Sequence, residues 1–286
     1  MKKVNVLIFT LVVIISALAL TIFLRDTRTP EIPTSQPVQT PPSVPVKKPI
    51  VHYPVPVPTP IPTPPQQQPP PAPRKEQQPV AVTAPELPKK LPPVQQSDES
   101  FRRALKSLKL DKPLFNLILV ENLIQRLVVT IDNLPEKRLP RAHLPLVPPK
   151  GRFITSGTTE SPQTSSRNWS RYNLQMQLLE TLDQDLVLKI YVYFYPLFQT
   201  AYEQLGYQNA YFNDRLINVI DHLLETPNPP EPIQLAQPSV LYVYADPLLE
   251  KLSAGQKILL RIGPDHRWKL LKILESYREK LINLQP

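Results

Sequence analysis

Cysteine is absent from the 286 residues, and glycine occurs only five times. Without cysteine the chain has no disulfide, no thiol nucleophile, no cysteine-ligated zinc and no N-terminal cysteine that could carry a lipid. The five glycines do not form a phosphate-binding loop, a dinucleotide-binding fingerprint or the elbow that carries a nucleophilic serine. The sequence therefore excludes thiol enzymes and argues against nucleotide-dependent ones.

Histidine is scarce as well, with four residues at positions 52, 143, 222 and 266. None belongs to an H-E-x-x-H motif or to a pair with the spacing of metal ligands on one helix. A metal site would need ligands from distant parts of the chain, which a single sequence does not reveal. We expect no metal and no cofactor.

The formal charge of +9 lies mostly in the first third of the chain. Residues 1–97 contain ten Lys and Arg against four acidic residues, whereas residues 98–286 contain 23 basic and 20 acidic residues. A local basic excess lies within residues 136–152, in Lys137, Arg138, Arg141, Lys150 and Arg152. Such a run is more often a solvated loop than a phosphate-binding surface, so we expect no nucleic acid among the partners.

An uncharged run rich in Val, Ile and Leu covers residues 4–24, between two lysines and Arg25. At 1.5 Å per residue, a helix of this length spans about 30 Å, the thickness of the hydrocarbon core. We predict residues 1–25 as a transmembrane anchor that contacts the membrane through residues 4–24. A signal peptide cut after an internal Ala-Leu-Ala sequence is the alternative, but cleavage there would leave an apolar N-terminus. The lysines favour a cytoplasmic N-terminus, which predicts a single-pass inner-membrane protein with a periplasmic C-terminal domain.

Proline accounts for 23 of the residues between Thr29 and Gln96, and glycine is absent there. Proline removes backbone donors, fixes φ and biases the preceding residue toward extended conformations, so we expect solvated polyproline II without a folded core. At about 3.1 Å per residue, this segment would extend up to roughly 210 Å. We predict residues 26–96 as a disordered stalk that carries a domain away from the membrane. A ligand strip for partner domains is the alternative, because P-x-x-P spacings occur in it.

Residues 97–286 are long enough for one domain with a single core, and their pattern is mainly helical. Ser97-Asp98 can cap a first helix that Lys112-Pro113 ends. A second helix is predicted from about Val120 to Asn133, because leucine and isoleucine recur there every fourth residue. The turn-rich residues 135–168 then predict a long surface loop.

Three helical segments follow between Arg171 and Glu225. The middle segment, residues 185–205, is apolar on nearly all sides and should lie in the core. Aromatic residues form one stripe along it: Tyr191, Tyr195, Phe198 and Tyr202. A ligand-stacking surface is conceivable, but a stripe at helical spacing is more often packed core. The third segment, residues 212–225, has one apolar and one polar side, and a solvated helix face explains the polar side.

The C-terminal part begins with residues 240–244, a β-branched and aromatic run that predicts a strand. Asp246-Pro247 has the pattern of a cap and first-turn proline that open a short helix. Ser253 to Lys257 turns the chain into another helix, and Gly263-Pro264 separates that helix from the last one. We therefore predict a mainly α fold, of the α+β type with a minor β-hairpin, for the C-terminal domain.

Several stretches of this region resemble a proteobacterial family of unknown function whose members also have an N-terminal hydrophobic segment and a proline-rich spacer. The resemblance covers roughly Ser97 to Leu281. The stretches that carry it are Tyr195-Pro196-Leu197-Phe198, Ala201-Tyr202-Glu203-Gln204-Leu205-Gly206-Tyr207, Phe212-Asn213-Asp214-Arg215-Leu216, Val219-Ile220-Asp221-His222-Leu223-Leu224, Ala245-Asp246-Pro247 and Leu252-Ser253-Ala254-Gly255-Gln256-Lys257. The resemblance implies no catalytic residue.

It does mark polar residues within otherwise apolar elements, and these are the candidate binding residues. They are Asn213, Asp214, Arg215, Asp221, His222, Ser253, Gln256 and Lys257. The competing interpretation is that they are helix caps and buried hydrogen-bond networks that tie helices together.

The leading hypothesis is a non-enzymatic binding or scaffold module of the periplasm, whose partner is a cell-envelope component, either peptidoglycan or an envelope protein. The alternative is a cell-wall hydrolase or transferase with paired carboxylates, either Asp183 with Asp185 or Asp214 with Asp221. A third hypothesis, energy transduction across the periplasm, fits less well because the domain lacks a strand-dominated pattern.

Overall fold

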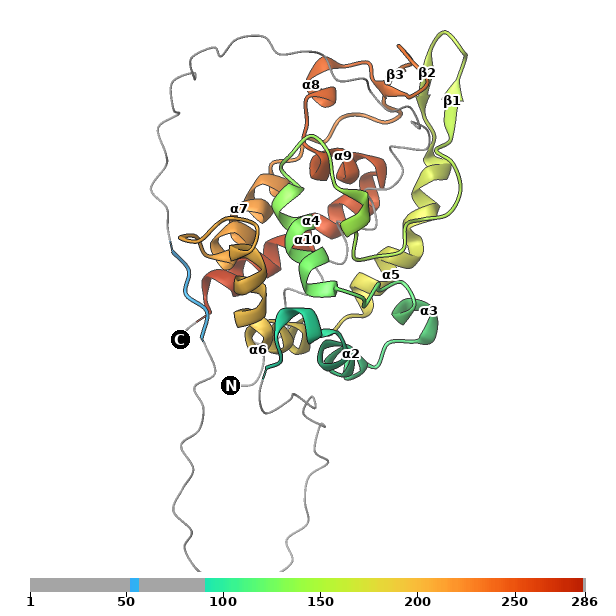
Figure 1. The fold of residues 1–286 in the computed structure, drawn as a ribbon. Coiled ribbons are helices and arrows are strands. Elements are labelled where there is room, and N and C mark those ends of the chain that lie inside the picture. The colour runs from blue at the N-terminus through green and yellow to red at the C-terminus, as the bar shows by residue number, and fades with distance from the viewer. Residues whose placement is uncertain (1–51, 57–90, 285–286) are drawn as a thin grey trace, which may run out of the picture.

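The computed structural model describes residues 52–56 and 91–284 (Figure 1). The predicted anchor and most of the predicted stalk lie outside these residues and remain predictions. Within the described ranges, no helix has both the length and the apolar character that a membrane span needs.

The described part is mainly helical, and two small antiparallel sheets accompany the helices, which confirms the predicted fold class for this region. The α-helices are α2 (Asp98–Lys106), α3 (Lys112–Phe115), α4 (Leu123–Asn133), α5 (Asn173–Thr181), α6 (Gln184–Glu203), α7 (Phe212–Leu224), α8 (Pro247–Glu250), α9 (Ala254–Arg261) and α10 (Pro264–Ile282). Short 3-10 helices cover η2 (Val94–Gln96), η3 (Arg141–His143) and η4 (Ser166–Tyr172).

The first predicted helix was wrong at its C-terminal end. It ends at Lys106, and Lys112-Pro113 begins α3. Proline lacks the N–H that a helix interior requires, but its fixed φ suits the first turn of a helix. The dipeptide expected to stop one helix therefore starts the next, after Lys109 has turned the chain with a positive φ of 50°.

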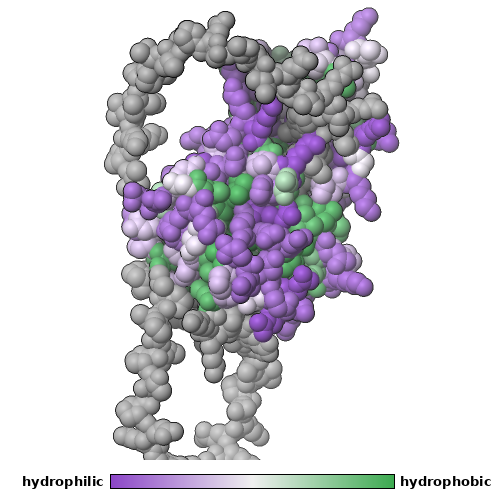
Figure 2. Space-filling model, in the orientation of Figure 1, coloured by the Kyte–Doolittle hydropathy of each residue, from purple (hydrophilic) through white to green (hydrophobic). Residues whose placement is uncertain are grey.

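The core forms where α4, α6, α7 and α10 pack against one another, with α7 lying along α10 (Figure 1). The aromatic stripe of α6 is buried in it, which confirms the packed-core interpretation. Phe198 of α6 stacks on Phe212 of α7 with ring centroids 5.7 Å apart and planes 6° apart. On the face drawn in Figure 2, hydrophilic residues cover most of the surface and apolar residues form separate patches.

The strands are short. β1 (Thr155–Gly157) pairs with β2 (Pro162–Thr164), and β3 (Leu235–Ala236) pairs with β4 (Val243–Tyr244), both antiparallel. The strand predicted over residues 240–244 is thus only two residues long, and Val240 is 69% exposed. Its partner strand offers only two residues, so the rest of the run has no backbone to pair with.

Two pieces of the segment predicted as stalk pack on the domain. Val94 in η2 is buried, and Val55 in the separate stretch 52–56 is only 8% exposed and belongs to the main core. Residues 52–56 run as an extended chain beside α7, drawn in blue in Figure 1. Packing of the domain therefore includes residues before Ser97, where the sequence placed the domain boundary.

Candidate functional site: a groove that holds an extended segment

The site lies at the start of α7, where the chain is fixed to α6 by one side chain. Gln199 Nε2 donates to the carbonyl of Ala210 over 2.9 Å, and its Oε1 accepts the N–H of Phe212 over 2.9 Å. The Phe212 side chain is fully buried. Together these contacts hold the first turn of α7 in place, so the two residues that follow Phe212 have a fixed position.

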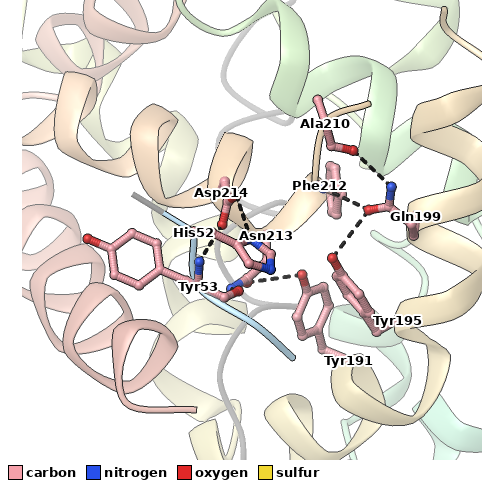
Figure 3. Close-up of polar contacts among 9 residues, drawn as sticks. All are labelled: His52, Tyr53, Tyr191, Tyr195, Gln199, Ala210, Phe212, Asn213 and Asp214. Atoms are coloured by element: carbon pink, nitrogen blue, oxygen red, sulfur yellow. Dashed lines mark hydrogen bonds and ion pairs between the residues drawn. The ribbon is translucent and has the colours of Figure 1, made fainter. Parts of the chain in front are cut away.

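Those two residues, Asn213 and Asp214, bind both backbone polar groups of Tyr53 (Figure 3). The Tyr53 N–H donates to Asp214 Oδ1 over 2.8 Å, and Asn213 Nδ2 donates to the Tyr53 carbonyl over 2.9 Å. A neighbouring β-strand would offer one residue the same pair of bonds through its backbone. Here two consecutive side chains of a helix provide them.

His52 completes the contacts of the Asp214 carboxylate. Its Nδ1 donates to Asp214 Oδ2 over 2.9 Å, so each carboxylate oxygen accepts one hydrogen bond from the segment. The imidazole also lies on the Tyr211 ring, with ring centroids 3.9 Å apart. Tyr211 itself is half exposed, so it forms the outer edge of the groove.

The segment continues past Tyr53 as Pro54-Val55-Pro56 and inserts Val55 into the core. The two prolines have no N–H to satisfy, so an extended chain can lie on the domain without a ladder of backbone partners. Recognition is therefore divided between a polar clamp at Tyr53 and an apolar anchor at Val55. We use the name α7 groove for the surface on which residues 52–56 lie, formed by Tyr211, Asn213, Asp214 and the part of the core that buries Val55.

Asn213 is oriented from inside the domain. Its side chain is fully buried, and its Oδ1 accepts a hydrogen bond from the Tyr191 hydroxyl over 3.2 Å (Figure 3). Burial raises the pKa of Tyr191 well above its ordinary value, and the nearby charges of Tyr195 and Asp214 raise it further. The hydroxyl therefore stays protonated and donates, which leaves the Asn213 amide nitrogen directed at the segment.

The other candidate residues of α7 have different partners. Arg215 Nε binds Asp132 Oδ1 of α4 over 2.8 Å, and its Nη2 donates to the Asp132 carbonyl over 2.6 Å. Asp221 forms an ion pair with Arg278 of α10. Both contacts tie α7 to a neighbouring helix, and neither residue contacts residues 52–56 through a hydrogen bond.

His222, Ser253 and Gln256 form a separate network at the other end of α7. Ser253 and Gln256 make a capping box at the start of α9, in which each side chain accepts the other's backbone N–H. The His222 Nε2 lies 2.9 Å from Ser253 Oγ, and Gln256 Nε2 donates to the His222 carbonyl over 3.1 Å. Burial lowers the pKa of His222. This network joins α7 to α9.

Lys257 pairs with Glu250 of α8, whose other carboxylate oxygen accepts the Tyr244 N–H over 2.9 Å. The eight candidate residues therefore fall into separate groups. The structure brings Asn213 and Asp214 together in a groove, and it distributes the other six among contacts between elements of the domain.

The carboxylates considered for hydrolysis are also engaged elsewhere. Asp183 caps α6 by accepting the N–H groups of residues 185 and 186, and Asp185 pairs with Lys280 over 3.1 Å. Asp214 binds the segment, and Asp221 binds Arg278 two turns further along α7. Across residues 52–56 and 91–284, no three His, Asp or Glu side chains are placed to hold a metal ion.

The sequence did not single out His52, Tyr53 or Val55 as site residues. One signal was present, since Tyr53 is the only aromatic residue and His52 the only histidine between residues 26 and 96. In a segment built from proline and small or polar residues, such a pair is the place where specific contacts with a folded surface can form.

The fold and the groove define a mainly helical domain that holds an extended, proline-containing segment at the start of one helix. The chain belongs to the family described as "Protein of unknown function (DUF3014)", whose model matches residues 123–278. This confirms the resemblance seen in the sequence. The matched region includes Asn213 and Asp214 but not residues 52–56. No curated protein and no solved structure gives a significant match to the chain.

Proposed function

We propose that this protein is a binding or scaffold module of the cell envelope, anchored in the inner membrane by residues 4–24, with its helical domain in the periplasm. The anchor and the stalk come from the sequence pattern described above. The absence of a nucleotide or thiol motif directs the proposal toward binding. The groove on α7 supplies the surface at which binding takes place.

One observation carries this proposal. Within the described residues, the hydrogen bonds of the Asp214 carboxylate and of the Asn213 amide nitrogen go to His52 and Tyr53. Both groups are buried when the segment is docked, so each needs a hydrogen-bond partner in that state; a buried neutral group without one costs about 1–3 kcal/mol, and a charged group costs more. The domain therefore presents two polar groups that an extended polypeptide satisfies. A polypeptide ligand favours an envelope protein over peptidoglycan as the partner.

Docking of residues 52–56 also bears on the reach of the tether. If residues 29–51 alone joined the membrane to the domain, polyproline II geometry would give roughly 70 Å, against roughly 210 Å for residues 29–96. A scaffold that exchanges its internal segment for a partner would then lengthen its own tether. With residues 52–56 docked, the shorter tether would hold the domain close to the membrane. With the segment released, the longer tether would let the domain reach across much of the periplasm.

The location can be tested with alkaline phosphatase fused after Pro286, because this reporter folds to an active form only outside the cytoplasm. We expect the fusion to be active in the membrane fraction and to resist extraction by high salt and carbonate. When a cleavable signal peptide replaces residues 4–24, the fusion should still be exported and active but no longer be bound to the membrane. An inactive reporter, or one that salt extracts from the membrane, would contradict the proposal. Fusion after Arg25 is the control for the topology of the anchor alone.

A further inference from the structure

We infer that the α7 groove is a receptor for extended proline-containing segments of a partner protein, and that residues 52–56 are an internal copy of that ligand. The inference rests on the proposed function, for which it names the ligand class. The segment seated in the groove defines the ligand. It has a ring with a donor nitrogen (His52), a residue whose backbone N–H and carbonyl are available (Tyr53), and then proline, an aliphatic residue and proline.

The polar clamp suits the residue that precedes a proline. Asn213 and Asp214 use the carbonyl and N–H of Tyr53, the last residue before Pro54. A residue before proline prefers an extended conformation, in which both of its backbone groups point sideways from the chain. A folded domain that reads proline-rich chains needs such a position, because the prolines themselves offer only carbonyl groups.

The side chains on either side of the clamp set the register. A ligand shifted by two residues along the Pro-Val repeat would place proline at the position of His52 and lose both the bond to Asp214 and the contact with Tyr211. It would still offer an aliphatic side chain to the part of the core that buries Val55. The contacts of Asp214 and Tyr211 with His52 therefore distinguish His-Tyr-Pro-Val-Pro from a plain Pro-Val repeat.

An outside ligand has to displace a tethered competitor. The 34 residues from 57 to 90 join the segment to the domain, so an outside ligand competes with an intramolecular one whose effective concentration depends on the length and stiffness of this linker. A partner segment can compensate by extending beyond residues 52–56. Leu205 and Tyr207 lie in the same loop as Tyr211 and are 42% and 41% exposed with the internal segment in place. They offer apolar surface to a longer ligand.

The direct test uses the full-length chain in detergent with its internal segment disabled by Tyr53→Pro and Val55→Asp. The probe is a fluorescein-labelled peptide with the sequence of residues 50–58, and binding is followed by fluorescence anisotropy. We expect saturable binding to the disabled chain and at least tenfold weaker apparent binding to the unmodified chain, whose groove is occupied.

Two controls separate the clamp from general affinity. Asn213→Asp places a carboxylate against the ligand carbonyl and should weaken binding roughly ten- to a hundredfold. Asn218→Asp makes the same chemical change at an exposed position of α7 and should leave binding unchanged. On the ligand side, N-methylation of the tyrosine replaces the N–H that donates to Asp214 by a methyl group and should cause a loss of similar or larger size.

Failure of the disabled chain to bind, with native circular dichroism, would overturn the inference, as would equal binding by the Asn213→Asp and Asn218→Asp chains. If the disabled chain does not fold, a protease site inserted between residues 57 and 90 opens the linker of the otherwise unmodified chain. Excess peptide should then release the N-terminal fragment, and a fragment that stays bound would show that residues 52–56 are a fixed part of the fold. The reporter fusion tests the proposed location, and the peptide measurements test the inferred ligand. Either result can be negative without the other, so failure of the proposed function and failure of this inference are distinguishable.

Discussion

The two ends of α7 carry polar residues in similar apolar surroundings but connect to different parts of the protein. At the first turn, Asn213 and Asp214 bind a segment about 160 residues away in the sequence. At the last turn, His222 binds Ser253 and the Gln256 side chain, about 30 residues away and inside the domain. The first set is completed by a segment that lies far from α7 in the sequence, whereas the second set is complete within the C-terminal domain.

The partners of a buried polar residue separate a structural role from a binding role. A network whose members satisfy one another, such as the capping box with His222, needs no ligand and stabilises the junction of α7 and α9. A pair whose remaining hydrogen-bonding groups point at a separate chain segment, such as Asn213 and Asp214, is the candidate that we propose for binding. Substitutions at the two ends should therefore affect different measurements: global unfolding at one end, and docking of residues 52–56 at the other.

The largest effect is expected from Gly255→Ala, at the end of α7 that is complete within the fold. An added Cβ would lie 2.6 Å from Leu223 Cδ2 and 3.1 Å from the Leu134 carbonyl oxygen, so the Leu223 side chain of α7 and the backbone after α4 would have to shift. We expect a loss of about 1–3 kcal/mol in the free energy of unfolding, measured by urea denaturation. Gly255 does not have a positive φ, so the substitution adds these contacts without the strain of a left-handed backbone. Unchanged or increased stability of Gly255→Ala would contradict the close packing.

A smaller loss should follow from Ser253→Ala, which removes the N-cap of α9 and the hydroxyl partner of His222. Loss of an N-cap costs about 0.5–2 kcal/mol. Ser253→Thr keeps the hydroxyl and should recover most of the stability in the same denaturation experiment. Because this network lies away from residues 52–56, peptide binding to the disabled chain should be the same in both variants. Weakened peptide binding by Ser253→Ala would show that the two ends of α7 are coupled.

At the other end, Val55→Ala should loosen docking and leave the rest of the domain folded. Removing two buried methyl groups costs about 1–2 kcal/mol, roughly a tenfold shift in the docking equilibrium. Since the chain has no cysteine, single cysteines at Pro56 and Asn218 can carry spin labels, and the distance distribution reports docking. We expect a narrow distribution in the unmodified chain and an added broad component in Val55→Ala. An unchanged distribution would show that Val55 is not the anchor.

Sequence patterns were sufficient for the helices that form the core. Residues 185–205 and 212–225 were predicted nearly to their ends, because an apolar helix and an amphipathic helix have distinct periodicities. Asp246-Pro247 began a helix as expected, with the Asp246 side chain accepting the Leu248 N–H. Patterns failed where the outcome depended on a partner, as in the run 240–244, whose strand is limited by the length of β3.

The groove could be predicted only in part, for the same reason. Asn213 and Asp214 stood out as polar residues among apolar ones, but so did His222 and Ser253, and spacing does not tell a ligand contact from a cap. The second half of the site lies in a segment whose composition excludes a core of its own. Nothing local indicates that Val55, one of several valines between prolines, enters the core of a domain that the sequence predicts to begin at Ser97.

The smallest expected effect is a pH dependence at the His222 end. Burial lowers the pKa of His222, so just below its ordinary value of 6.5 the unfolded chain binds more protons than the folded one. Stability contributed by neutral His222 is therefore complete above pH 6.5 and is lost as the pH falls below it, by at most about 1.4 kcal/mol per pH unit for one proton. His222→Gln keeps a donor toward Ser253 without titrating. Burial raises the pKa of Glu231, which gives the opposite slope at lower pH, but Glu231 is present in both chains. The free energy of unfolding is measured for the unmodified chain and for His222→Gln from pH 7.5 to pH 5, and the difference between the two chains isolates His222. If the two plots of unfolding free energy against pH are parallel, burial of His222 in the folded state does not affect its protonation.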